Sequence, residues 1–270
     1  MNQKDSETIN KELLVYQRKW FDEIVKHWID ESRTNSKKKK YFLRHNDTEE
    51  FSFAEPFFTS LYKADDLLPI VMFVGQETNG WGDYIDFKQT IEEKGIDEAI
   101  TNSQAFVSAF TKNNVVDRNK KLKKQGSKAY DSHAFWNFIR AFYDGTNNKI
   151  RVVWTELDKI HYACFPDDKC IKLWEKDESM LSAEVLDGKS MLMWEIELIR
   201  PDLVVFLTGP SYAHSMETAI GHDIIKKPTN EDSIQKFKIS GIQCIWTYHP
   251  NSLCRQGLWD KVLADLVQLI

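Results

Sequence analysis

Short apolar runs alternate along the chain with longer amphipathic segments, and this alternation indicates an α/β fold. Four runs are apolar at nearly every position, which is typical of strands buried on both faces of a parallel sheet. These four predicted strands are residues 70–74, 150–154, 203–207 and 242–246. We therefore predict a three-layer α/β/α sandwich with a central, mainly parallel four-stranded sheet.

Apolar residues that recur every three or four positions predict the helices between these strands. A long amphipathic helix is expected over residues 9–29, and a hairpin is expected where Ser240-Gly241 separates residues 237–239 from the fourth strand. Asp131 or Ser132 is a predicted N-cap, and Ser211 is another. The other predicted helices cover residues 85–94, 96–110, 135–143, 191–199 and 258–269.

Composition limits the domain organisation and the partners. The chain has 270 residues, of which 42% are hydrophobic, so it can bury a large core. We predict an N-terminal helical extension (residues 1–67) packed on an α/β domain (residues 68–270). The net charge of −5 excludes a protein that coats nucleic acid by charge alone. Basic runs at 37–40 and 118–128 are either solvated loops or, beside a cleft, contacts for a phosphate backbone.

Several classes of protein are disfavoured by what the sequence lacks. No apolar run approaches about 18 residues, so we expect no membrane span, and the first residues lack the apolar core of a signal peptide. The four cysteines show no Cys-x-x-Cys spacing, which favours reduced cytosolic thiols over a metal site. We expect a cytoplasmic monomer that uses neither a metal nor another cofactor.

Polar residues follow each of the four predicted strands. The first strand leads into Gly75-Gln76-Glu77, the second into Thr155-Glu156, the third into Thr208–Ser211, and the fourth into a segment that contains His249. Because parallel strands end at the same edge of a sheet, these residues can converge on one ligand-binding cleft. The alternative is a set of ordinary strand-to-loop turns, in which glycines serve the backbone and polar residues face water.

Two of these strand ends resemble the motifs of the uracil-DNA glycosylase superfamily. Its best-known branch has Gly-Gln-Asp-Pro-Tyr-His after the first strand and His-Pro-Ser-Pro-Leu after the last. This chain has Gly75-Gln76-Glu77 and His249-Pro250-Asn251-Ser252-Leu253 at the corresponding places, and the similarity spans residues 68–270. The resemblance implies the family's α/β/α fold, a DNA partner, and hydrolysis of the N-glycosidic bond of a flipped base.

The resemblance also implies roles for individual residues. Glu77 takes the place of the carboxylate that stabilises the sugar cation and orients water, and His249 takes the place of the neutral donor to the departing base. Gln76, Trp81 (or Phe87) and Glu156 would bind the base. Ser211 and Ser252 would hold phosphates, and Leu253 would fill the gap that the flipped base leaves.

Three departures from the family pattern leave the activity open. Glu77 replaces Asp and adds a methylene, while Thr78 and Asn79 replace the Pro-Tyr that excludes thymine. Glu156 stands near the family's base-reading Asn, and an ionised carboxylate only accepts hydrogen bonds. This predicts a base richer in N–H donors than uracil, a protonated Glu156, or no base. The alternatives to a glycosylase are a catalytically inactive binding module and a hydrolase of free nucleosides or nucleotides.

Overall fold

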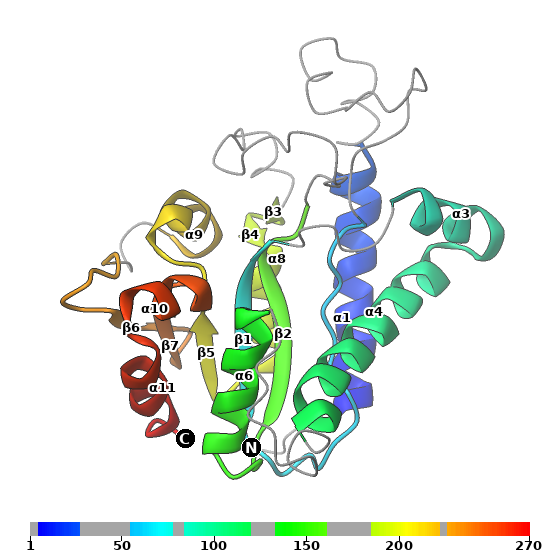
Figure 1. Ribbon diagram of the computed structural model, residues 1–270. Coiled ribbons are helices and arrows are strands. Elements are labelled where there is room, and N and C mark those ends of the chain that lie inside the picture. The colour runs from blue at the N-terminus through cyan, green and yellow to red at the C-terminus, as the bar shows by residue number, and fades with distance from the viewer. Residues whose placement is uncertain (1–4, 28–54, 78–83, 120–132, 161–184, 222–225) are drawn as a thin grey trace, which may run out of the picture.

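A five-stranded, mainly parallel sheet forms the centre of the protein. The computed structural model describes residues 5–27, 55–77, 84–119, 133–160, 185–221 and 226–270 (Figure 1). The strands of this sheet are β1 (Ile70–Glu77), β2 (Arg151–Asp158), β5 (Leu203–Phe206), β6 (Ile234–Ile239) and β7 (Ile242–Thr247). Their order is β2-β1-β5-β7-β6, and only β6 runs antiparallel to its neighbour.

The edge strand β6 explains why the sheet has one strand more than the predicted four. Buried Gln235 and Ile239 alternate in β6 with exposed Lys236 and Lys238, so this strand has no continuous apolar run. Exposed lysines on an edge strand also discourage pairing with another chain. The predicted β6–β7 hairpin is confirmed, and its turn residue Ser240 has a positive φ of 49°.

A second, two-stranded hairpin is absent from the prediction. It consists of β3 (Val185–Leu186) and β4 (Lys189–Ser190). Asp187 and Gly188 form its turn with φ values of 53° and 74°. Asp-Gly is a strong signal for a turn of this kind, so the sequence carried the information.

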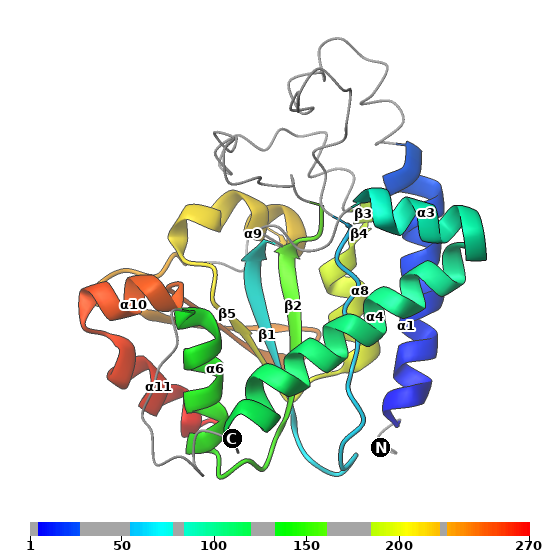
Figure 2. The same ribbon diagram turned by 45° about the vertical axis from the view of Figure 1, so that its right-hand side comes forward.

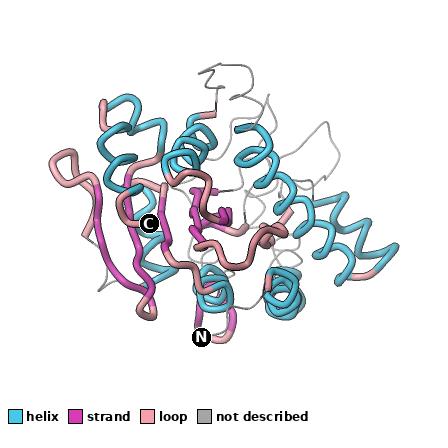
Figure 3. The backbone as a smooth tube through the Cα atoms, turned by 90° about the horizontal axis from the view of Figure 1, so that it is seen from below, coloured by secondary structure: helices cyan, strands magenta, loops and turns pink. Residues whose placement is uncertain are grey.

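Helices cover both faces of the sheet (Figures 1 and 2), and the view from below in Figure 3 shows them on either side of the strands. The helices that bury side chains on one face are α4 (Ile96–Lys112), α6 (Ala134–Gly145), α10 (Pro250–Gln256) and α11 (Trp259–Val267). Those on the opposite face are α1 (Ser6–Trp20), α8 (Met191–Ile199) and α9 (Ala213–Ile220). The three-layer α/β/α arrangement follows from this distribution.

Most predicted helices are found near their expected bounds. The first predicted helix comprises α1 and the π-helical turn η1 (Phe21–Val25), and α3 spans Tyr84–Lys94. The turn η3 (Asn113–Asp117) extends α4, and the 3-10 turn η5 (Pro210–Tyr212) precedes α9.

The N-caps of α6 and α9 are not the residues that the sequence predicts. His133 is the N-cap of α6, and the predicted caps Asp131 and Ser132 lie outside the described residues. The prediction for Ser211 is wrong, because this residue lies within η5 and Tyr212 is the N-cap of α9.

Helix α1 belongs to the core of the α/β unit. Ile9 and Leu13 are 2% and 1% exposed and join the cluster that contains Met72 and Val204 of the central strands. Full burial of such a side chain stabilises the fold by about 1.5–3 kcal/mol. The division at residue 67 remains a prediction, since α1 shares its core with the strands.

None of the helices in the described ranges combines the length and apolar character that a membrane span requires.

Candidate functional site

Hydrogen bonds connect the carboxyl ends of β1 and β7 through the loop that follows β5. The side chain of Gln76 donates from Nε2 to the carbonyl oxygen of Thr208 at 2.7 Å. The N–H of Gly209 donates to the carbonyl of Thr247 at 3.0 Å. Gly209 has a φ of 74°, and a Cβ there would lie 3.5 Å from the backbone nitrogen of His249. The positive φ is what favours glycine here, because a Cβ at 3.5 Å would make only an ordinary van der Waals contact.

His249 is held as a neutral hydrogen-bond donor. It is the N-cap of α10, and its Nδ1 accepts the backbone N–H of Asn251 at 3.2 Å. Pro250 follows at the first helical position, where its fixed φ suits the start of a helix. Burial lowers the pKa of His249 from 6.5 to about 4, so the ring is neutral at pH 7. Because Nδ1 is the acceptor, the proton of the neutral ring lies on Nε2.

Phe135, at the start of α6, covers the imidazole of His249. The two rings are nearly parallel, 16° apart, with 6.2 Å between their centroids. Phe135 also lies 6.4 Å from the ring of Trp154 in β2. Sequence reasoning placed Phe135 in a helix, but periodicity does not show that this helix begins over the strand ends.

Glu156 is a buried carboxylate in β2, the strand that pairs with β1. It is 3% exposed, and its Oε1 accepts the indole N–H of Trp154 at 2.7 Å. Glu156 pairs in register with Gly75 of β1, and a Cβ on Gly75 would lie 2.2 Å from Glu156 Oε2. The glycine therefore leaves room for the carboxylate. Through Trp154 and Phe135, Glu156 is connected to His249.

Four other predicted site residues are Glu77, Ser211, Trp81 and Gln76. Glu77 ends β1 in register with Asp158, so its backbone is at the same sheet edge as Glu156. Ser211 is exposed in η5, after Gly209, and Trp81 lies outside the described residues. Gln76 contributes its side chain to the link between loops described above.

The two predicted DNA-binding residues of α10, Ser252 and Leu253, differ in burial. Ser252 is half-buried in the first turn, where its N–H donates to the carbonyl of His249 at 2.8 Å. Leu253 is 0% exposed and belongs to the main core. A wedge must leave the protein surface to enter a duplex, so the role predicted for Leu253 does not fit its burial.

Phe87, the alternative to Trp81 for stacking on a base, is also a core residue. It is 4% exposed, and its ring centroid lies 5.4 Å from that of Phe21 and 5.5 Å from that of Phe58. This cluster joins α1, α3 and α4, so the prediction for Phe87 is wrong.

A buried ion pair anchors the end of β2 from the other face of the sheet. Lys159 Nζ and Glu195 Oε2 are 2.6 Å apart, and both side chains are 1% exposed. Thr155 donates its hydroxyl to the same carboxylate oxygen at 2.7 Å. Burial raises the pKa of Glu195, and the charge of Lys159 opposes this rise. No local sequence pattern indicates this pair, which fixes the end of β2 against α8.

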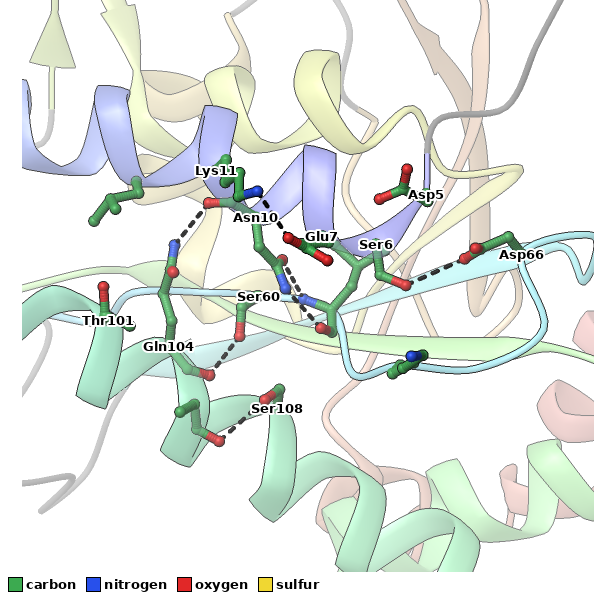
Figure 4. A pocket seen from close by; sticks show the side chains of 14 residues that line it. Asp5, Ser6, Glu7, Asn10, Lys11, Ser60, Asp66, Thr101, Gln104 and Ser108 are labelled. Carbon is green, nitrogen blue, oxygen red and sulfur yellow. Dashed lines mark hydrogen bonds and ion pairs between the residues drawn. The ribbon is translucent and has the colours of Figure 1, made fainter.

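A groove lies away from these strand ends, between α1, α4 and the segment before β1 (Figure 4). Its volume is about 710 Å³. The Asn10 side chain both donates to and accepts from the backbone of Leu61 at 2.8 Å, and Gln104 donates to Gln17 at 2.8 Å. These hydrogen bonds join α1 to the segment before β1 and to α4, and the groove lies along this packing contact.

Within the described ranges, His, Cys, Asp and Glu side chains form no group of three that could hold a metal ion. No protein-family model matches the chain, and no curated protein matches it.

Proposed function

We propose that the chain is a DNA glycosylase-like protein that hydrolyses the N-glycosidic bond of a flipped, damaged or modified base. The observation that carries this proposal is the state of His249. A neutral imidazole with its N–H on Nε2 can donate to the negative charge that develops on a departing base. Donors of this kind contribute most where water is excluded, and Phe135 covers one face of the ring.

Glu77 supplies the second half of the proposed mechanism. Loss of the base leaves positive charge on the sugar, and a carboxylate near C1′ stabilises it and orients the attacking water. Support comes from the position of the Glu77 backbone, at the end of β1 and one strand away from the β5 loop that contacts His249.

Glu156 sets the class of base in this proposal. An ionised carboxylate accepts hydrogen bonds and repels a carbonyl oxygen, so the base presents N–H groups where uracil presents a carbonyl. The indole N–H of Trp154 donates to Oε1 of this carboxylate at 2.7 Å and holds it in place. The ring of Phe135 lies 6.4 Å from the ring of Trp154, which donates to this carboxylate.

A catalytically inactive nucleic-acid or nucleotide-binding module of the same fold is the second candidate. The observation that favours it is the burial of Leu253, since an enzyme that flips bases out of a duplex needs a group to fill the gap. Glu77 adds to this, because an extra methylene displaces the carboxylate and ~1 Å of misplacement costs on the order of 100-fold in rate.

A base-release assay separates the candidates. Single-stranded and duplex oligonucleotides that carry uracil, hypoxanthine, xanthine or alkylated bases are incubated with the protein, and abasic sites are detected by alkaline cleavage. We expect release of at least one base, and a loss of roughly 100- to 1,000-fold in His249→Ala. The control is His214→Ala, which changes an exposed histidine in α9. Full activity in His249→Ala refutes the assignment, and binding without release of any base supports the second candidate.

A further inference from the structure

The two edges of the central sheet differ in what covers them. The outer edge of β2 is bonded to the segment that precedes β1. The Thr59 hydroxyl donates to the carbonyl of Trp154 at 2.6 Å, and the Val152 N–H donates to the hydroxyl of Tyr62 at 3.2 Å. This segment therefore supplies hydrogen-bond partners for backbone groups of β2 that face away from β1.

Strand β6 ends the sheet on the other side, beyond β7 (Figure 1). The residues that flank its turn, Ile239 and Ile242, form a hydrogen-bonded pair, and such pairs alternate along an antiparallel ladder. Ile234, Lys236 and Lys238 therefore direct their backbone N–H and C=O groups away from β7. Among the described residues, no other backbone group bonds to this outer edge.

The side chains of β6 give its outer edge two different faces. Successive residues of a strand point to opposite sides, so the exposed side chains of Lys236 and Lys238 share one face. In the described part of the chain neither lysine has an ion-pair partner, and Asp232, which precedes the strand, is paired with Lys226 at 3.6 Å. The opposite face carries the half-buried ring of Phe237.

We propose that the β6 edge binds an extended segment of a partner protein in which acidic and apolar residues alternate. This segment adds a strand beside β6, and its backbone pairs with the outward groups of Ile234, Lys236 and Lys238. Its carboxylates lie beside the two lysines, and its apolar side chains lie on the face of Phe237. The interaction is independent of the activity proposed for His249.

The lysines favour this occupant over a second copy of the chain. Exposed lysines discourage most strands from adding to an edge, and two paired β6 edges would place lysines beside lysines. Like charges on neighbouring strands destabilise the pair, whereas opposite charges stabilise it. The same two side chains therefore disfavour self-association and select an acidic partner.

The test is fluorescence anisotropy at low ionic strength with the full chain and a labelled peptide that alternates glutamate with valine. The peptide is about eight residues long, within the usual length of a strand. One control peptide has the same composition with all glutamates at one end, and the other has lysine in place of glutamate. We expect the alternating peptide to bind about tenfold more tightly than either control.

Charge reversal in β6 tests the contribution of the side chains. Lys236→Glu/Lys238→Glu should weaken binding of the alternating peptide by about tenfold or more, because each attraction becomes a repulsion. Lys149→Glu is the matched control with unchanged affinity, since Lys149 is also exposed but precedes β2 at the other edge of the sheet. Equal affinity of the double variant and the wild type overturns the inference.

Amide hydrogen exchange tests the contribution of the backbone. The alternating peptide should slow exchange at Ile234, Lys236 and Lys238 by about tenfold or more, and change Gln235 and Phe237 less, because the N–H groups of these two face β7. Binding that leaves the three outward amides unprotected overturns the inference. Equal binding of both glutamate peptides, together with an oligonucleotide that requires the same lysines, also overturns it and assigns the surface to phosphates.

Discussion

Replacing Gly75 by Ala adds one Cβ atom and tests how closely the Glu156 carboxylate packs against the backbone of β1. The new Cβ would lie 2.2 Å from Oε2 and 2.7 Å from Oε1 of Glu156, so the carboxylate must move. Glu156 is 3% exposed and bonded to the Trp154 indole, so movement strains a buried, hydrogen-bonded group. We expect Gly75→Ala to lower the free energy of unfolding by about 1–3 kcal/mol.

The same substitution should have the opposite sign when Glu156 is shortened. In a Glu156→Ala background the colliding carboxylate is gone, and Ala in place of Gly restricts the unfolded chain, which stabilises the protein by about 0.4–1 kcal/mol. In Glu156→Gln the side chain keeps its size, so Gly75→Ala remains destabilising. This pair of backgrounds separates a steric conflict from an electrostatic one.

Chemical denaturation of the wild type, the single variants and the double variants measures these free energies as a double-mutant cycle. Thermal melting gives a second measurement, with about 2–4 °C for each kcal/mol in domains of comparable size. Additive effects of Gly75→Ala and Glu156→Ala would refute the reasoning, because the carboxylate would then lie elsewhere.

Three further predictions concern titratable groups. Phe135→Ala exposes His249, so its pKa should rise from about 4 toward 6.5 in an NMR titration; an unchanged pKa would show that Phe135 does not shield the ring. Burial raises the pKa of Glu55 from 4.5 to about 7, so the folded state binds the proton more tightly and stability falls as pH rises from 4.5 through 7. Glu55→Gln should remove this slope and stabilise the protein at pH 8 by about 1–3 kcal/mol, measured by urea denaturation; a slope that persists would assign it to another group. Lys159→Met leaves the Glu195 charge buried and should lower stability by about 3–5 kcal/mol, most of which Lys159→Met/Glu195→Leu should recover in the same assay; a double variant no better than the single one would contradict this account.

The sequence predicted the elements of the sheet that depend on continuous apolar runs. The runs that contain Val71, Val153, Val204 and Ile245 became the four parallel strands, because both faces of each are covered by helices. Strand β6 has no continuous apolar run, because buried and exposed residues alternate along this edge strand.

The site was predictable only as far as strand ends reveal it. Gly75 and Glu156 lie near the carboxyl ends of β1 and β2, and His249 follows β7, so topology alone brings them to one edge. Phe135 lies at a helix start, and no local pattern shows what a helix start covers. For Leu253 the motif itself led to a wrong expectation. Its place in the motif suggested a role at the surface, but its side chain is packed in the core.

The burial of α1 against later elements has a consequence for synthesis of the protein. Ile9 and Leu13 leave the ribosome well before Ile196 and Trp246, which belong to the same cluster. Until those residues emerge, the apolar face of the first helix has no complete partner, and exposed apolar surface promotes aggregation in a nascent chain. We therefore expect the α1 segment to expose its apolar face during synthesis until the strands and helices that cover it have emerged.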